Sequence, residues 1–360
     1  MTTSQVIETE PVVEQEGENK KMSCYKPLIR IYSPENREIS GQVYSLARYS
    51  ERVGKKLKYE DLMYEPKVML IPCGQCIGCR IQQREDWTTR IELEARQWPK
   101  EQVWFITLTY DDDHVPGMIL STGEIMRKVQ YVWKPGKKTP ESVQTLLYTD
   151  VQKFLKRLRR AYKSKLRFFC AGEYGEQTAR PHYHMILYGW KPTDLKQLYK
   201  IHHNGYYTSE WLEKLWGNGQ IQIAQAVPET YRYVAGYVTK KMYEIDGKKA
   251  NVYHELGQQK PFACMSLKPG LGDAYYQEHK EEIWKQGYIQ CTNGKQAQIP
   301  RYYEKMMEKE NPERLWRIKQ NRQRKAIEQK RLQFEGKDYK TQLETKERVI
   351  KKQMKKRGNL

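Results

Sequence analysis

The stretch from Phe168 to Trp190 reads FFCAGEYGEQTARPHYHMILYGW, and it determines how the rest of the chain is interpreted. An apolar segment is followed by a loop rich in glycine and charged residues, and a second apolar segment begins at Pro181. If residues 181–189 form a β-strand, side chains two positions apart point to the same face. His182 and His184 then project side by side, a spacing that suits two imidazoles binding one divalent ion.

The arm before this strand offers a carboxylate for the same ion. Glu173 lies where a neighbouring strand would pair beside the histidines, and Glu176 in the following loop is the alternative. Two imidazoles and one carboxylate leave positions open for water and substrate, as in catalytic Mg²⁺, Mn²⁺ or Zn²⁺ sites. Such an ion can polarise a phosphoryl oxygen and orient it for attack. Histidine pairs at this spacing also occur without a metal, so the interpretation depends on the surrounding sequence.

Charge indicates the kind of partner. The 360 residues include 64 Lys and Arg against 44 Asp and Glu, a net charge of +20, which favours nucleic acid or an anionic membrane surface. A transmembrane helix is excluded, because no run of about 18 apolar residues exists. The N-terminus carries no Lys or Arg before Lys20 and no apolar core, so it is not a secretory signal. We therefore expect DNA or RNA as a partner and no membrane.

A predicted helix and the last segment of the chain carry basic residues that suit such a partner. The helix begins near Thr149 and Asp150, a good N-cap pair, and its polar side presents Lys156, Arg157 and Arg160. These are either a solvated face or a phosphate-contacting one. A last segment, residues 301–360, holds 20 basic and 9 acidic residues and reads as an exposed basic helical arm.

Three of the seven cysteines form the pattern C-x2-C-x2-C in the segment IPCGQCIGCR. In a long chain without an export signal, such a cluster favours metal binding over disulfides. Cys73, Cys76 and Cys79 with Cys24 could form a four-thiolate structural Zn²⁺ site, the alternative being free thiols that stabilise a turn. The remaining Cys170, Cys264 and Cys291 are expected to be isolated small apolar residues.

A further helix is predicted to begin at Pro228 and to reach about Tyr243. Tyr233 and Tyr237 are spaced i and i+4, so both hydroxyls lie on one face. Lys240 and Lys241 follow within one turn of Tyr237. Tyrosine is a poor nucleophile at its usual pKa of about 10, and a metal-polarised phosphodiester and a nearby cation would help it. Amphipathic core tyrosines are the alternative, but combined with a histidine pair and a basic chain the two tyrosines indicate attack on a DNA phosphodiester.

These motifs resemble those of HUH endonucleases, the initiators of rolling-circle replication. FITLTY (105–110) resembles the first motif of that family, RPHYHMILYG (180–189) the metal motif, and YVAGYVTKK (233–241) the two-tyrosine motif. MSCY (22–25), PCGQCIGCR (72–80) and SLKPGLG (266–272) extend the resemblance to initiators of gokushovirus-type microviruses, small phages with single-stranded DNA. Gly236 departs from the pattern, which is expected to have a basic residue between the tyrosines.

The resemblance implies an α+β fold: an HUH core with an antiparallel sheet of about five strands and helices on one face. It covers about residues 22–305 and leaves the acidic start and the basic arm outside, so we expect the chain to divide into five segments. These are a disordered acidic tail (1–21), a Cys-rich N-terminal segment with a helix (22–100), the HUH core (101–260), an extension of the core (261–305) and the basic helical arm (306–360).

The resemblance further implies a mechanism. With Mg²⁺ or Mn²⁺ bound, one tyrosine attacks the single-stranded viral origin, leaving a 5′-phosphotyrosyl link and a free 3′-OH for a host polymerase. The second tyrosine later cleaves the regenerated junction, and the strand is rejoined. Because no G-x-x-x-x-G-K-[ST] phosphate loop is present, unwinding would need a host helicase. Such a protein would act in the host bacterial cytoplasm.

Two other functions fit the same residues. One is a non-catalytic zinc-dependent DNA-binding or packaging protein, for which His182 and His184 would be dispensable. The other is a His/Glu metallohydrolase that uses water and forms no covalent intermediate.

Overall fold

The computed structural model has an α+β fold with one large antiparallel sheet. It describes residues 24–33, 38–62, 65, 68–127, 142–175, 180–201, 204–240, 258–292, 294–315, 317–319, 321–322 and 338–356. The expected acidic tail, 1–21, lies outside these ranges. No helix among the described residues is long and apolar enough to cross a membrane.

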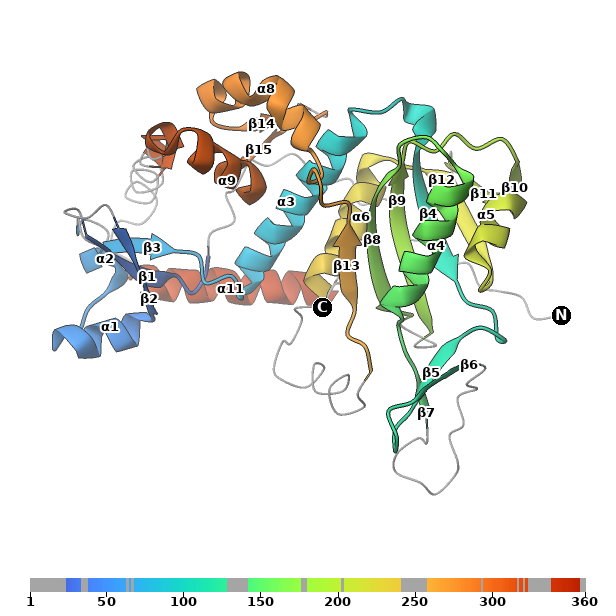
Figure 1. Ribbon diagram of the computed structural model, residues 1–360. Helices are drawn as coiled ribbons and strands as arrows, with labels where there is room; N and C mark the ends of the chain where they lie inside the picture. The colour runs from blue at the N-terminus through green and yellow to red at the C-terminus, as the bar shows by residue number, and fades with distance from the viewer. Residues whose placement is uncertain are drawn as a thin grey trace.

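Seven antiparallel strands form the main sheet, in the order β10-β11-β12-β4-β9-β8-β13 (Figure 1). Their bounds are β4 (Val103–Thr109), β8 (Arg167–Tyr174), β9 (Pro181–Tyr188), β10 (Leu195–Ile201), β11 (Asn204–Ser209), β12 (Ile221–Gln225) and β13 (Phe262–Met265). β4, β8 and β9 lie near the middle and are rich in aromatic and β-branched residues, which favour strands. The sequence predicted β9 and the neighbouring strand that carries Glu173.

Helices cover both faces of this sheet. On one face α4 (Tyr148–Ala161) and α5 (Glu210–Trp216) pack over inward side chains such as Tyr183 and Met185. On the other face α3 (Ile77–Ala95) and α6 (Pro228–Lys240) pack over Ile186 and Tyr188. Because strand side chains alternate, consecutive residues of β9 belong to two separate cores.

The expectation of about five strands with helices on one face was therefore wrong in both respects. The hairpin of β10 and β11 extends one edge of the sheet, and β13 adds a strand at the other. β8 and β9 are buried along almost their whole length, which is the pattern of strands covered on both faces. Residues 185–188 form a continuous apolar run, which is the sequence pattern of a strand buried on both faces.

Smaller elements surround the main sheet. A three-stranded sheet contains β1 (Leu28–Ser33), β2 (Glu38–Tyr44) and β3 (Val68–Ile71), beside α1 (Leu46–Val53) and α2 (Tyr59–Leu62). A second contains β5 (Pro116–Ile119), β6 (Ile125–Arg127) and β7 (Ser142–Gln144), and these hairpins are inserted between β4 and α4. The remaining elements are the short η1 (Lys100–Gln102), then α8 (Asp273–Gln286), β14 (Ile289–Gln290), β15 (Gln296–Ala297), α9 (Arg301–Glu310) and α11 (Tyr339–Lys356).

A buried ion pair joins α3 to the main sheet. Arg167 Nε lies 2.6 Å from Glu94 Oε1, and both side chains are almost fully buried. Glu94 Oε2 also accepts the Gly272 backbone N–H at 2.8 Å, while Arg167 donates to the carbonyls of Pro269 and Gly270. The pair therefore has the further hydrogen bonds that buried charges require, and it fixes the SLKPGLG loop beside the sheet.

The start of α4 differs from the expected N-cap at Thr149 and Asp150. Leu147 is the N-cap residue, and the Asp150 side chain is buried inside the fold. Asp150 accepts two hydrogen bonds from Arg127, at 2.8 and 2.9 Å, and one from the Tyr110 hydroxyl at 2.6 Å. A buried carboxylate needs such partners, so Asp150 ties the inserted hairpins to the core instead of capping the helix.

The α4 core can be tested by one truncation. Leu158 is fully buried on α4, so we expect Leu158→Ala to lower the free energy of unfolding by about 2–5 kcal/mol. Urea denaturation followed by circular dichroism measures the change. The exposed Lys156 lies on the same helix, and Lys156→Ala should shift it by no more than about 0.5 kcal/mol. Equal effects of the two changes would contradict the packing described above.

Candidate metal and tyrosine site

Two neighbouring strands, β8 and β9, bring the predicted metal ligands together. In the antiparallel register His182 of β9 lies opposite Glu173 of β8, and His184 lies two positions further on the same face. Glu173, His182 and His184 each offer a ligand atom, and these atoms lie within 4.8 Å of one another. Glu176, the alternative ligand, lies outside the described residues.

Hydrogen bonds orient both imidazoles toward the same point. His182 Nδ1 lies 3.1 Å from the Arg180 carbonyl oxygen, which can only accept, so this nitrogen carries the proton. The other ring nitrogen, Nε2, lies 3.0 Å from Glu173 Oε1, so a proton or a metal ion has to lie between these two atoms. His184 Nδ1 lies 3.1 Å from Thr107 Oγ1, and its Nε2 lies 3.2 Å from the same carboxylate oxygen. A second hydrogen bond that fixes the outer nitrogen is typical of metal-binding histidines.

Burial makes this arrangement one that favours a cation. Glu173 and His184 are 8% and 6% exposed, so few water molecules can solvate the carboxylate. His184 stacks on Phe105 at 5.6 Å and on Tyr237 at 5.1 Å between ring centroids, with nearly parallel planes. The His182 side chain is 19% exposed and is the most accessible of the three. The group could hold a divalent metal ion, approached from the His182 side.

Helix α6 places both predicted tyrosines against this group. The ring centroids of Tyr233 and Tyr237 lie 5.2 and 5.1 Å from that of His184, and 4.9 Å from each other. Their exposures differ: Tyr233 is 50% exposed, whereas Tyr237 is 3% exposed. The i, i+4 spacing thus puts both rings beside the histidines, one open to solvent and one covered.

The environment of Tyr237 raises the pKa of its hydroxyl well above the usual value. Burial is the largest cause, followed by the neighbouring Tyr233 and the negative charge of Glu173. A cation bound at Glu173 would oppose the last of these causes. The side chain of Lys240 and the whole of Lys241 lie outside the described residues.

Several neighbours of the site were missed by the sequence analysis. Thr107 orients His184 from β4, and Arg180 fixes the segment before His182 by donating to the Tyr110 carbonyl and to Asp112. Strand pairing alone reveals Thr107, because it lies directly opposite His184. No local pattern marks it.

Arg84 of α3 lies next to the position where the motif departs from its expected pattern. A Cβ atom added at Gly236 would sit 3.9 Å from Arg84 Cδ. The basic residue expected between the tyrosines is absent from α6, but α3 brings an arginine to the same turn. The two residues are 152 positions apart in the chain, so only the packing of the two helices reveals the juxtaposition.

The predicted DNA-binding residues of α4 lie across the sheet from the histidines. Lys156, Arg157 and Arg160 are exposed on a helix that packs on the Tyr183 face, opposite to the His182 face. Arg157 also donates to the carbonyls of Leu215 and Trp216, at 2.6 Å each, where α5 ends. Any DNA contact made by α4 is thus separate from the metal group.

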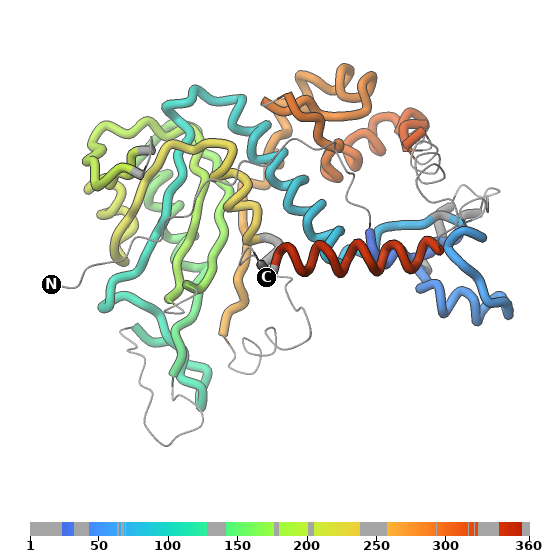
Figure 2. Tube along the Cα trace, turned by 180° about the vertical axis from the view of Figure 1, so that it is seen from behind, coloured from blue at the N-terminus to red at the C-terminus, as the bar shows by residue number. Residues whose placement is uncertain are grey.

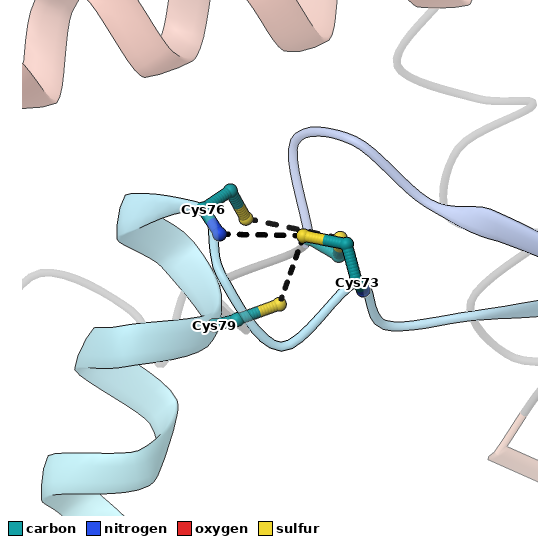
Figure 3. A group of neighbouring side chains, drawn as sticks. Cys73, Cys76 and Cys79 are labelled. Carbon is teal, nitrogen blue, oxygen red and sulfur yellow. Dashed lines mark hydrogen bonds between the residues drawn. The ribbon is translucent and has the colours of Figure 1, made fainter. Parts of the chain in front are cut away.

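The four predicted zinc ligands meet at the start of α3, and Figure 3 shows three of them, Cys73, Cys76 and Cys79. Their sulfur atoms lie within 4.8 Å of one another, and Cys24 joins the three closely spaced cysteines. The Cys73 and Cys79 sulfurs are 3.9 Å apart, and those of Cys76 and Cys24 are 3.8 Å apart, far beyond the length of a disulfide. This group could also hold a metal ion. Cys170 and Cys264, expected to be isolated, lie directly opposite each other on β8 and β13.

Comparison with known proteins adds relatives to this geometry. Residues 103–242, which span β4 to α6, match a family model of replication-associated proteins of the ORF2 type. Replication-associated protein VP4 of Bdellovibrio phage phiMH2K is 27% identical over 71% of this chain and 75% of its own. The chain is a homologue of phage replication-associated proteins.

Two further relatives support that statement. Replication-associated protein ORF2 of Spiroplasma virus 4 is 26% identical over 80% of this chain and 81% of its own length. Replication-associated protein ORF4 of Chlamydia phage 1 is 28% identical over 66% of this chain and 54% of its own. No solved structure matches the chain. The resemblance to gokushovirus-type initiators, first drawn from short motifs, is thereby confirmed.

Metal binding at the Glu173 group can be measured directly. We expect Glu173→Gln to weaken Mn²⁺ binding at least about tenfold, because the amide carries no charge between the two imidazoles. Isothermal titration calorimetry gives the affinity. His279 lies on α8, outside the group, and His279→Ala should leave binding unchanged. Equal Mn²⁺ affinity for the wild-type protein and Glu173→Gln would contradict the assignment.

Proposed function

We propose that this protein acts in viral DNA replication as an HUH-type endonuclease and strand transferase. It nicks single-stranded or supercoiled viral DNA at the origin and later rejoins the displaced strand. The observation that supports this most is the placement of two tyrosine rings about 5 Å from His184, in the ligand group that also contains Glu173 and His182. The homology to phage replication-associated proteins supplies the biological setting.

The metal group would bind Mg²⁺ or Mn²⁺ through Glu173, His182 and His184. Carboxylate and imidazole ligands with open positions suit these ions. When bound, the ion supplies Lewis-acid polarisation of the scissile phosphate. The protein's own contribution is orientation: Thr107 and the Arg180 carbonyl hold the two rings so that both Nε2 atoms face the Glu173 carboxylate.

Tyr233 is the first nucleophile in this proposal. Its ring is half exposed and can meet an incoming strand, whereas Tyr237 is covered in the same state. The phenol oxygen of Tyr233 bonds to phosphorus while the bond from phosphorus to the 3′ oxygen breaks. The phenol loses its proton, the 3′ oxygen gains one, and a 5′-phosphotyrosyl link remains.

Tyr237 then cleaves the regenerated junction. The 3′-OH released by that cleavage attacks the phosphorus of the Tyr233 link, the Tyr233 phenol leaves and regains its proton, and the circle is closed. The joining step therefore consumes no nucleotide triphosphate. A host polymerase would extend the first 3′-OH and a host helicase would unwind the duplex, which places the reaction in the host bacterial cytoplasm. Lys240 and Lys241 are proposed to assist the tyrosines as cations, and Lys156, Arg157 and Arg160 to contact DNA phosphates on the far side of the sheet.

The second candidate is a non-catalytic zinc-dependent DNA-binding or packaging protein. The four-cysteine group is compatible with it, and we propose that this group holds a structural Zn²⁺ in either case. A purely binding role gives no reason for two tyrosines to lie against a Glu/His/His group. The tyrosine geometry therefore favours the endonuclease.

The nicking proposal is tested with a labelled single-stranded origin oligonucleotide and Mg²⁺ or Mn²⁺. The double change Tyr233→Phe with Tyr237→Phe removes both phenol oxygens, so we expect covalent protein–DNA adducts to disappear on denaturing gels. Tyr237→Phe alone should still form one adduct but fail to rejoin strands, and Tyr233→Phe should lose the first adduct.

Tyr231 lies on the same helix but is buried away from His184, and Tyr231→Phe serves as the matched control that keeps full adduct formation. Adducts that survive in the double variant would refute tyrosine attack. Cleavage without any adduct in the wild-type protein would favour a hydrolase that uses water.

A further inference from the structure

The two ends of the described chain meet at the four cysteines. Cys24 is the first described residue, and α11 ends the described part of the chain at Lys356. One apolar cluster contains residues of both ends together with the cysteines, among them Tyr25, Cys76, Tyr339 and Leu343. Both views show α11 running from the small sheet of β1–β3 toward the main sheet (Figures 1 and 2).

The sulfur positions match what zinc requires. Four thiolates at a Zn–S distance of about 2.3 Å form a tetrahedron whose sulfur atoms are about 3.8 Å apart. The sulfur atoms of Cys76 and Cys24 lie 3.8 Å apart, and those of Cys73 and Cys79 lie 3.9 Å apart. Backbone N–H groups point at three of the sulfurs: Cys73 at Cys24, Cys76 at Cys73, and Tyr25 at Cys76, at 3.2–3.3 Å. Such donors stabilise the thiolate form that binds the metal.

The last helix docks on this group by a narrow apolar stripe. Tyr339 and Leu343 are 7% and 2% exposed, and Ile350 and Met354 continue the same side of α11 onto the cluster. The Tyr339 ring meets that of Tyr59 edge-on at 6.1 Å, and Glu60 accepts the Tyr339 backbone N–H at the start of the helix. The sequence indicated an exposed arm, but one side of α11 is packed against this cluster.

The opposite side of α11 is basic. The helix carries seven Lys and Arg against two Glu, a net of +5, and the exposed Arg348 and Lys352 lie on the side away from Leu343. Docking the apolar stripe therefore fixes the direction in which these cations point. A fixed row of cations suits a phosphate backbone better than a free arm does, because less conformational entropy is lost on binding.

We propose that the four-cysteine zinc site is a clasp that holds the basic helix α11 on the N-terminal module. Zinc fixes Cys24 and the turn of Cys73–Cys79. These residues form part of the surface on which Tyr339, Leu343 and Met354 pack. Loss of zinc releases the segment at Cys24 that precedes β1, disrupts this packing surface and frees α11. The proposal rests on the zinc site but not on nicking, and it makes α11 a DNA-phosphate surface whose position depends on zinc.

The test uses the full-length protein and limited trypsin digestion, with zinc content measured by atomic absorption. We expect one Zn²⁺ per chain, and at least about tenfold faster cleavage within residues 340–352 after removal of zinc with 1,10-phenanthroline. Adding Zn²⁺ back should restore protection. Cys76→Ser should lack zinc and behave as the chelated protein, while Cys291→Ser, a cysteine outside the group, should behave as wild type.

Variants on α11 separate the clasp from zinc binding itself. Leu343→Asp places a charge on the buried stripe, so it should keep the zinc but expose α11 to trypsin. Val349 is 49% exposed on the same helix, and Val349→Asp should keep both zinc and protection. A full-length protein without zinc would overturn the site. If zinc is present but its removal does not change the cleavage of α11, the clasp is refuted. Equal cleavage of Leu343→Asp and Val349→Asp would also refute it.

Neither readout depends on DNA cleavage, so failure here is distinct from failure of the nicking proposal. Binding to a single-stranded oligonucleotide lacking the origin provides the functional arm. Releasing α11 should flatten the dependence of affinity on salt, because fewer phosphates are neutralised at once. An unchanged slope in Leu343→Asp would exclude α11 from the DNA surface.

Discussion

The register between β8, β9 and β4 is the constraint on which the site depends. Glu173 faces His182, and Thr107 faces His184, only because these strands pair as they do. A slip of one residue would turn His182 and His184 to the opposite face, toward the core under α4. Such a slip would also move Ile186 and Met185 each into the opposite core. The apolar alternation that builds two cores thus also holds the metal ligands on one face, so packing and chemistry select the same register.

Local features of this site could be predicted from the sequence, and features made by distant residues could not. The His-x-His spacing, the i, i+4 tyrosines and the C-x2-C-x2-C turn are each set by one strand, helix or turn. Arg84 beside Gly236 and the docking of α11 depend on which helix packs on which, and no short pattern encodes that. The predicted number of strands was wrong partly for a related reason, because β13 joins one edge by pairing with β8, far earlier in the chain. At the other edge the β10–β11 hairpin pairs with the nearby β12.

Helix α3 connects the two groups of potential metal ligands. Its N-terminal end carries Cys76 and Cys79, and its later turns pack on α6 through Ile91 and the neighbouring Trp87. Glu94 near its C-terminal end is locked by Arg167 and the SLKPGLG loop. A helix fixed at both ends behaves as a rigid strut, so the position of α6 against His184 is supported from outside the sheet. The Cys-rich segment and the tyrosine helix are in this sense one structural unit.

The unequal burial of the two tyrosines bears on how alternation between them could work. With both rings beside His184, either hydroxyl can approach a phosphate near the metal group, but only Tyr233 is open to solvent. Tyr237 lies under it, stacked on His184, with its hydroxyl near Glu173 and its pKa raised mainly by burial. If Tyr233 carries the first strand, its displacement by the linked DNA would uncover Tyr237 for the second cleavage. The two tyrosines would then act one after the other because Tyr233 covers Tyr237 on the same face of α6, and no movement of the sheet is required.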